Sequence, residues 1–430
     1  MNRVFMMHAS KKQGVGNPVS KGQFIGSHAR WNPIRARGVR IAVLMSLLVS
    51  LIGCGSISLW GSDDKATAPA TLTKFEPRIQ IKKIWKRDVG AGAEDLHIKL
   101  TPIVHGKTNE KRLFVATPEG EVHAYDAQTG DVLWETDIDM PIRGGPGVGT
   151  KAVLVGSNNG KVVALSQNNG RILWQARTSS EVLTMPQEKN GVVIVRTVDG
   201  KLFGLEQSGG KHRWLYERSV PVLTLRGTST PVIVRNLVIA GFDGGQLVAL
   251  SVEDGRPIWE SRIALPRGRS DIERMVDIDG EMVVVGNAIY VATFQGGVAA
   301  VDVASGNIFW RRDISSYAGL GVAGDTLYVT DEKSHVWALD RYTGKTLWQH
   351  TKLERRNLTA PVGFSPIGFG EYVVVGDFEG YAHILDGKDG RIMARIRVDK
   401  RRILTPPIVA DDTLYVYGGS GKLMAVGVGE

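Results

Sequence analysis

The chain has 430 residues, of which 43% are hydrophobic and 23% are charged, and it contains a single cysteine. One cysteine excludes an intrachain disulfide framework and any metal site built from several thiolates. Glycine is abundant, with 52 residues, whereas there are only 17 prolines. This balance indicates many tight turns between ordered strands rather than a disordered chain.

The net charge of +9 is concentrated at the N-terminus. Residues 1–53 hold eight Lys and Arg and no Asp or Glu, so the rest of the chain has 45 basic and 44 acidic residues. A nucleic-acid interface needs positive charge clustered on the folded domain. We therefore expect no nucleic-acid partner.

The first element predicted is a lipoprotein signal peptide over residues 1–53. Three arginines precede the apolar run 41–52. This run is too short to cross a ~30 Å hydrocarbon core, but it suits the hydrophobic region of a signal peptide. Residues 51–54 read Leu-Ile-Gly-Cys, which resembles the lipobox of bacterial lipoproteins. The resemblance implies that Cys54 is lipidated and becomes the mature N-terminus. The alternative is a buried strand with a core cysteine, which would leave the basic, acid-free flank unexplained.

Residues 54–77 are expected to form the lipidated cysteine and a flexible tether. As a random coil this segment would span roughly 25–30 Å. Gly55 follows the cysteine, and by resemblance to enteric lipoproteins the absence of Asp there implies the outer membrane. The folded part would then lie in the periplasm, anchored to the membrane by its lipid.

From residue 78 to residue 430 the chain repeats one unit: an apolar strand, a glycine turn, an alternating strand, a second glycine turn and a strand with tryptophan. The tryptophan spacings are 40, 40, 45, 51 and 38 residues. A glycine stands four residues before each tryptophan of the complete copies, and a seventh copy has Ala394 in place of the tryptophan. Units of about 40 residues with four short strands are typical of β-propeller blades. The repeat tryptophans are Trp85, Trp134, Trp174, Trp214, Trp259, Trp310 and Trp348.

The two ends of the repeat region complement each other. Residues 78–88 contain a tryptophan strand without the strands that should precede it, and the copy that starts at Thr413 stops before its tryptophan strand. Pairing these ends would remove the free sheet edges. The sequence therefore predicts an all-β fold, an eight-bladed propeller of four-stranded antiparallel blades closed by its N-terminal strand. An open β-solenoid is the alternative.

The repeated residues are interpreted first as structural. Each indole is expected to pack between neighbouring blades while its N–H finds a backbone carbonyl. Asp126, Asp302 and Asp340 stand in Ala-x-Asp-x-x-Thr/Ser-Gly turns, where an aspartate accepts hydrogen bonds from backbone N–H groups two or three residues on. We expect no metal site from these carboxylates, which belong to separate blades.

The Ala-x-Asp-x-x-Thr-Gly-x-x-x-Trp repeat resembles that of pyrroloquinoline-quinone (PQQ) dehydrogenases, which also occurs in propellers that are not enzymes. Combined with a lipobox, a short tether and eight units, the chain resembles the BamB family, lipoproteins of the bacterial outer-membrane β-barrel assembly (BAM) machinery. The resemblance implies loops that bind the periplasmic POTRA domains of BamA. The matching positions are Leu223, Leu225, Arg226, Asp277 and Asp279, with Arg274 as a weaker candidate.

The two longest tryptophan spacings, 45 and 51, are consecutive, and they contain the residues that match the partner-binding loops. Their extra residues follow Trp214 and Trp259, in connections between one blade and the next. Neighbouring connections lie on one face of a propeller, so apolar and arginine side chains would share a patch of the kind that interfaces favour. The alternative is that both loops are tolerated insertions and that Asp277 and Asp279 only shape a turn.

Two other functions compete with a non-catalytic scaffold. A quinoprotein dehydrogenase needs Ca²⁺, a base and, by resemblance, an adjacent cysteine pair, whereas the only cysteine here is expected to carry lipid. No two histidines of the mature part lie at metal-ligand spacing, and we expect neither a metal nor a cofactor. A periplasmic glycan-binding propeller would need exposed aromatic residues, for which Tyr317, Trp337 and Tyr342 are available.

We therefore expect a scaffold that holds the POTRA domains of BamA and assists the folding and insertion of outer-membrane proteins. Unfolded outer-membrane proteins are a possible second partner, by addition of a strand to an exposed sheet edge.

Overall fold

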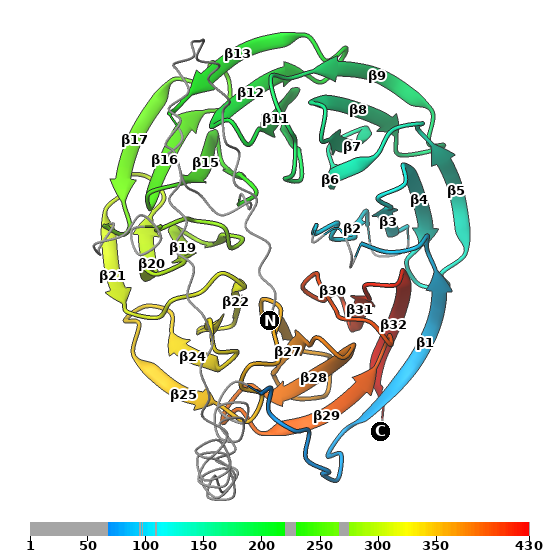
Figure 1. The fold of residues 1–430 in the computed structure, drawn as a ribbon, viewed down its shortest axis with the longest axis vertical. Coiled ribbons are helices and arrows are strands. Elements are labelled where there is room, and N and C mark those ends of the chain that lie inside the picture. The colour runs from blue at the N-terminus through cyan, green and yellow to red at the C-terminus, as the bar shows by residue number, and fades with distance from the viewer. Residues whose placement is uncertain are drawn as a thin grey trace, which may run out of the picture. The chain divides into compact units, whose positions relative to one another are not determined.

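The structure, a computed structural model, describes residues 68–93, 96, 98–107, 110–219, 229–265 and 275–429. These residues form 32 β-strands and no α-helix. Within the same ranges, no helix is long and apolar enough to cross a membrane. The strands make eight four-stranded antiparallel sheets, arranged as blades around a ring (Figure 1). This arrangement confirms the predicted eight-bladed propeller.

The first four blades follow one another along the chain, each with its innermost strand first. Blade 1 is β2 (Ile103–His105), β3 (Arg112–Ala116), β4 (Glu121–Asp126) and β5 (Val132–Asp137). Blade 2 is β6 (Ile142–Val148), β7 (Ala152–Ser157), β8 (Lys161–Ser166) and β9 (Ile172–Arg177). Blade 3 is β10 (Gln187–Lys189), β11 (Val192–Arg196), β12 (Lys201–Glu206) and β13 (His212–Glu217). Blade 4 is β14 (Val232–Val234), β15 (Leu237–Phe242), β16 (Gln246–Ser251) and β17 (Pro257–Arg262).

The next three blades have the same order of strands. Blade 5 is β18 (Val283–Val285), β19 (Ala288–Thr293), β20 (Gly297–Asp302) and β21 (Ile308–Arg312). Blade 6 is β22 (Gly319–Ala323), β23 (Thr326–Thr330), β24 (Val336–Asp340) and β25 (Thr346–His350). Blade 7 is β26 (Val362–Phe364), β27 (Tyr372–Gly376), β28 (Tyr381–Asp386) and β29 (Ile392–Arg397).

Blade 8 joins the two ends of the chain. Its inner strands are β30 (Ile408–Ala410), β31 (Thr413–Tyr417) and β32 (Lys422–Gly429), and its outer strand is β1 (Gln80–Asp88). The β1–β32 ladder runs from the pair Gln80–Gly429 to the pair Asp88–Lys422. The N-terminal strand therefore completes the last blade, as the sequence predicts.

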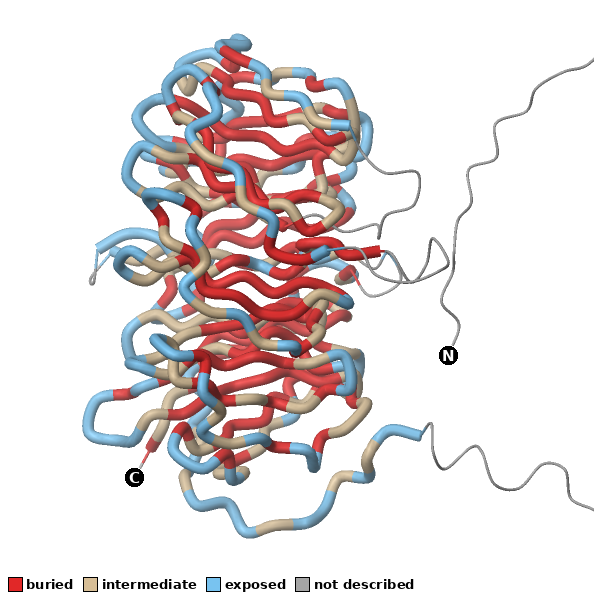
Figure 2. Tube along the Cα trace, turned by 90° about the vertical axis from the view of Figure 1, so that its left-hand side faces the viewer, coloured by how far each residue is buried: buried red, intermediate tan, exposed pale blue. Residues whose placement is uncertain are grey.

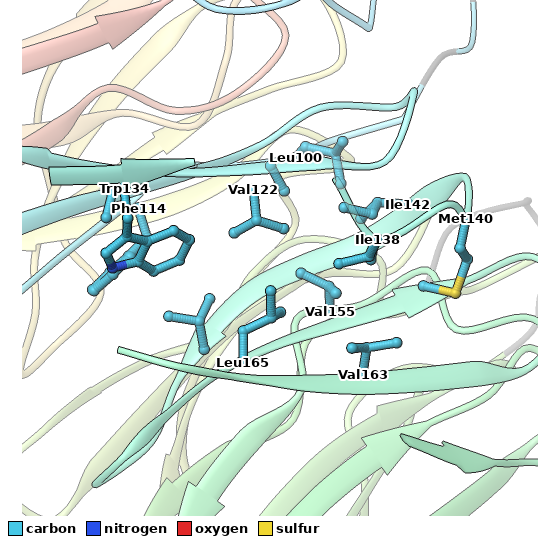
Figure 3. Close-up of a cluster of buried hydrophobic side chains, with 13 residues drawn as sticks. Leu100, Phe114, Val122, Trp134, Ile138, Met140, Ile142, Val155, Val163 and Leu165 are labelled. Carbon is cyan, nitrogen blue, oxygen red and sulfur yellow. The ribbon is translucent and has the colours of Figure 1, made fainter. Parts of the chain in front are cut away.

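The hydrophobic core is divided among the contacts between blades. Each of the eight junctions has its own cluster of buried apolar side chains. Figure 3 shows the cluster between blades 1 and 2, where Phe114 and Trp134 meet Val155 and Leu165. The middle strands are buried on both faces, and many exposed residues lie in turns (Figure 2). Because both faces pack against neighbours, these strands read as short, nearly continuous apolar runs.

Every repeat tryptophan packs against the last turn of the following blade. The indole N–H of Trp134, for example, donates to the Gln167 carbonyl at 2.8 Å. Gly170 of the same turn has a φ of +69°, and a Cβ there would lie 2.3 Å from the Thr136 Oγ1 and 2.6 Å from the indole. Only glycine fits both the backbone conformation and the space. The same tryptophan N–H to carbonyl bond recurs at Trp85, Trp174, Trp214, Trp259, Trp310 and Trp348.

Ala394 occupies the tryptophan position of blade 7 because the receiving turn does not exist. In blade 8 the third strand, β32, and the outer strand, β1, come from opposite ends of the chain, so no turn connects them. The Arg78 N–H instead donates to the Met393 carbonyl at 2.8 Å, and Ile79 and Ile81 pack against the cluster that contains Ala394. The segment that begins at Arg78 and enters β1 thus fills the space that a tryptophan would occupy.

One edge of the ring carries two kinds of segment, the connections from each outer strand to the next blade and the turns between the second and third strands. We call this edge the connection face. The described part of the expected tether begins here: the Ala70 N–H donates to Glu354 O at 2.9 Å, and Arg356 donates to Ala70 O at 2.9 Å. Arg395 then lies over Phe75 at 5.1 Å from the ring centroid. Residues 70–78 therefore lie against blades 6 and 7.

Candidate partner-binding face

The predicted partner-binding residues lie in two consecutive connections of this face, from β13 to β14 and from β17 to β18. Leu223, Leu225, Arg226 and Arg274 fall outside the described residues, as does Cys54 at the expected lipid anchor. Asp277 and Asp279 are described. They lie where the second connection returns to blade 5.

Asp277 is buried, with 1% of its surface exposed. Its carboxylate accepts a hydrogen bond from the Gly244 N–H at 3.3 Å, and its carbonyl accepts one from the Phe294 N–H at 3.1 Å. It therefore joins the second connection to the turns of blades 4 and 5. In this position, Asp277 supports the base of the loop from inside.

Arg196 joins the first connection to blade 3. It ends β11 and is 2% exposed, and its Nη1 donates to the carbonyl of Ser229 at 3.0 Å and to its hydroxyl at 3.2 Å. The guanidinium also lies over the Phe242 ring, 5.0 Å from its centroid. A buried cation is stable only with hydrogen bonds or compensating charge around it.

The compensating charge comes from Asp243, Asp277 and Asp279. Burial and then the nearby Asp277 raise the pKa of Asp243 to about 6, against the opposing effect of Arg196. Burial, followed by Asp277 and Asp243, raises the pKa of Asp279 well above its usual value. Both carboxylate oxygens of Asp279 are buried and have no hydrogen-bond partner. The bases of the two connections therefore share a charged cluster of one arginine and three aspartates.

Further charges couple this cluster to connections from other parts of the ring. Burial lowers the pKa of Lys99, while Glu281 and Asp279 oppose the shift and Arg402 adds to it. Lys99 lies between β1 and β2, on the opposite side of the ring from Glu281. Both side chains have solvent-accessible surface, but protein atoms surround their charged groups closely enough to shift both pKa values. We infer that these side chains approach one another near the ring axis, on the connection face.

Sequence reasoning missed Arg196 and Asp243. Arg196 carries a local signal, because it ends the otherwise apolar strand Val192–Arg196, whose residues are all buried. A charge at the end of such a strand must find partners inside the protein. Asp243 carries no such signal, since aspartate is ordinary in a hairpin turn. What makes it unusual is the connection that folds over it from another part of the chain.

A family model described as outer membrane protein assembly factor BamB matches residues 72–146, 118–350 and 343–428. The chain is 50% identical over 384 residues to the outer membrane protein assembly factor BamB of Pseudomonas aeruginosa, which covers 89% of this chain and 97% of the relative. The chain belongs to the BamB family. Its fold has a TM-score of 0.71 to the crystal structure of BamB from Moraxella catarrhalis, with 27% identity over 81% of this chain and 100% of that one.

The BamB fold is shared with enzymes. A quinohemoprotein alcohol dehydrogenase from Pseudomonas putida has a TM-score of 0.65, covering 82% of this chain and 76% of that one. At 13% identity this likeness shows the propeller fold alone.

Proposed function

We propose that this protein is a non-catalytic scaffold of outer-membrane protein assembly, which binds the POTRA domains of BamA through its two long connections. Membership of the BamB family carries the proposal, because its relatives are named as assembly factors and not for a reaction. The charged cluster supports it. Arg196 and Asp277 hold the bases of both connections on neighbouring blades, so the two connections are fixed side by side where they join the propeller.

We assign different tasks to two groups of residues in these connections. Leu223, Leu225, Arg226 and Arg274 supply apolar anchors and arginines, which dominate binding energy in interfaces. Asp277 and Asp279 act from the base of the second loop, where hydrogen bonds to Asp277 fix the backbone and the Asp279 carboxyl group is buried beside it. Beside them is an open groove of about 410 Å³. It is lined in part by Leu265, which lies at the start of the connection from β17 to β18.

The test is capture of the full-length chain, purified in detergent, by the periplasmic domains of BamA. Arg226→Glu should weaken capture by about 2 kcal/mol or more, roughly thirty-fold in Kd. Arg256→Glu makes the same charge change in the turn before β17, on the other edge of the ring, and serves as the control. Equal capture of both variants at equal folding would reject the interface, and absence of wild-type capture would reject the partner.

Asp279 provides a second arm that separates binding from stability. Asp279→Asn removes the ionisable carboxyl group while keeping the shape, and the raised pKa of Asp279 shows that this buried position disfavours the ionised form. We therefore expect the variant to be as stable as wild type or more stable, yet captured more weakly. Unchanged capture would mean that this carboxylate does not orient the loops.

We further propose that the protein is anchored to the periplasmic face of the outer membrane through Cys54, with residues 1–53 as the signal peptide and residues 54–77 as the link to the propeller at residues 78–430. Cys54→Ser should move the protein from the membrane fraction to the soluble fraction. Mass spectrometry of the wild-type N-terminal peptide should show the attached acyl chains. Unmodified Cys54 in the membrane fraction would contradict this anchor.

The outer strands suggest how an unfolded outer-membrane protein could bind. Several carry an exposed apolar residue beside the repeat tryptophan, as Leu133, Leu173 and Phe309 do at 47%, 51% and 58% exposure. An extended peptide could pair with such an edge and cover these side chains. A strand-forming peptide should compete with unfolded outer-membrane protein for the wild-type chain, and Leu173→Lys should weaken the binding. Lack of any binding would refute this role.

A further inference from the structure

Blade 1 holds a histidine between two glutamates, on the face that turns toward blade 8. His123 lies on β4 with 6% of its surface exposed, and its Nε2 is 3.3 Å from the nearer Glu121 carboxylate oxygen. Glu135 is directly opposite His123 in the β4–β5 ladder, and its carboxylate lies 3.4 Å from Nδ1. One donor atom from each of the three residues lies within 4.8 Å of the others.

The ring nitrogens of His123 are not fully used by the protein. Nδ1 is buried and makes no hydrogen bond, even though the Glu135 carboxylate is near. A buried polar atom without a partner is uncommon in folded proteins and calls for an explanation such as an ion. Arg87, a positive group on the facing blade, donates from Nε to the Gly130 carbonyl at 2.7 Å and lies 3.5 Å from Asp131.

Blade 7 has a histidine at the same place with both nitrogens occupied. His383 lies opposite Arg395 in the β28–β29 ladder, as His123 lies opposite Glu135. Its Nε2 is 2.8 Å from the Asp377 carboxylate, and its Nδ1 accepts from the Arg395 Nε at 3.2 Å. The positive Arg395 opposite His383 occupies its Nδ1 and would repel a cation. The glutamate opposite His123 would attract one.

The contact on the Nδ1 side of His123 matches ligand spacing about a metal better than ion pairing. Charge-assisted N–H···O bonds are ordinarily about 2.7–2.9 Å long, so the 3.4 Å between Nδ1 and the Glu135 carboxylate is long for one. Zinc bonds of about 2.0–2.2 Å in a tetrahedron place neighbouring ligand atoms about 3.3–3.5 Å apart, which is the spacing of this pair. Nε2 points away from this side and cannot bind the same ion, so Glu121, 3.3 Å from Nε2, must turn toward Nδ1 to become a ligand. We propose that Glu121, His123 and Glu135 form a zinc-binding site on the side of blade 1.

The donor set determines the ion. An imidazole with two carboxylates suits Zn²⁺, while Mg²⁺ prefers oxygen ligands alone. Nδ1 of His123 would bind the metal, and the two carboxylates would neutralise its charge. Glu135 already lies on that side, and Glu121, with a side chain 38% exposed, is free to turn onto the ion. Three protein ligands leave a fourth position for water. Tyr125 stacks beside the imidazole at 5.9 Å with an interplanar angle of 8° and limits its movement.

The test is zinc titration of the full-length chain in metal-free buffer, followed by calorimetry and by thermal unfolding. We expect zinc to bind and to raise Tm, and Mg²⁺ to do neither. Glu135→Gln and Glu121→Gln should each weaken zinc binding at least tenfold, the loss seen even when an outer partner of a metal ligand is removed. Both glutamates are partly or largely exposed, so these variants should fold.

Glu260→Gln is the matched control. Glu260 follows Trp259 as Glu135 follows Trp134, but its cross-strand partner is Val248 instead of a histidine. Its zinc binding should equal that of wild type. The proposal is overturned if wild type binds no zinc, or if Glu135→Gln and Glu260→Gln bind it equally well. In either case Glu121 and Glu135 only flank an ordinary buried histidine.

Discussion

Seven of the eight junctions between blades are built alike, and the eighth is not. At the seven regular junctions a tryptophan from one outer strand covers a glycine turn of the next blade and donates to a carbonyl there. At the junction of blades 7 and 8 there is no turn, and Ala394 faces the lead into β1. A regular junction depends on residues of two local hairpins, whereas the closing junction depends on joining the two ends of the chain.

This difference shows that the repeat and its exception have one cause. The tryptophan is present wherever a turn receives it, and it is missing where the turn is missing. Because the closing ladder joins residues about 340 positions apart, it is also the pairing with the largest loss of chain entropy. We therefore expect the closing junction to control whether the ring forms and the regular junctions to control how stable it is.

The largest effect should follow removal of the closing strand. A chain that lacks residues 1–88 loses β1 and exposes the edge of β32, which invites aggregation. We expect loss of the cooperative thermal transition in circular dichroism and aggregates in size-exclusion chromatography. A chain that lacks only residues 1–67 keeps β1 and should fold. If the shorter chain melts like the longer one, the ring does not need this closure.

The next largest effect should come from breaking a regular junction. Trp134→Ala removes an indole that is 8% exposed, together with its bond to Gln167. The free energy of unfolding should fall by ~3–5 kcal/mol, as for other buried aromatic residues. Denaturant titration would measure the change. The adjacent Leu133→Ala is the control, because Leu133 is 47% exposed and should change stability by less than ~1 kcal/mol.

The reverse substitution tests the closing junction. Ala394→Trp restores the repeat sequence in blade 7, yet the indole would enter the cluster of Ala394, Met424 and Val426 without a turn to cover. Overpacking of this kind should lower the free energy of unfolding by ~1–3 kcal/mol. A gain in stability would show that the missing turn does not explain the alanine. Unfolding in denaturant beside Trp134→Ala gives the comparison.

Much of the fold could be predicted because the repeat reports local packing. Glycine and tryptophan recur at fixed spacing since each turn needs a positive φ and space for an indole, and Asp126 and Asp340 recur because each accepts two backbone N–H bonds in its turn. Such constraints depend on only a few residues that are close together in the sequence. They predict blades, their number and the closure.

The charged sites could not be predicted in the same way. Arg196 meets Ser229 and the aspartates only after the connections of two blades fold over it. His123 comes close to Glu135 through the strand register, although the two residues are twelve positions apart in the sequence. The family resemblance supplied Asp277 and Asp279, but no local pattern indicates that the carboxylate of Asp277 lies buried beneath the loop.

The smallest effect concerns one junction with a pH-sensitive group. At several junctions, the side chain two residues after the repeat tryptophan donates a hydrogen bond to the carbonyl of the glycine in the turn that the tryptophan covers. The donors are Arg87, Thr136 and Arg312. At the junction of blades 6 and 7 this position is His350, which is hydrogen-bonded to the backbone of Gly390. Burial lowers the pKa of His350 to about 4, the hydrogen bond to Gly390 opposes the shift, and the nearby Lys352 adds to it.

The sign of the pH effect follows from this lowered pKa. The unfolded chain takes up the proton near pH 6.5 and the folded chain only near pH 4, so the contribution of neutral His350 is complete above pH 6.5 and is lost as the pH falls. Between pH 7 and pH 5 the loss should be at most about 2 kcal/mol.

His350→Gln removes this group, and unfolding titrations at both pH values should show a smaller pH dependence than wild type. His383, whose pKa burial also lowers, remains in both proteins, so only the difference between them reports on His350. An equal pH dependence in the two proteins would mean that His350 is protonated as readily in the folded junction as in the unfolded chain.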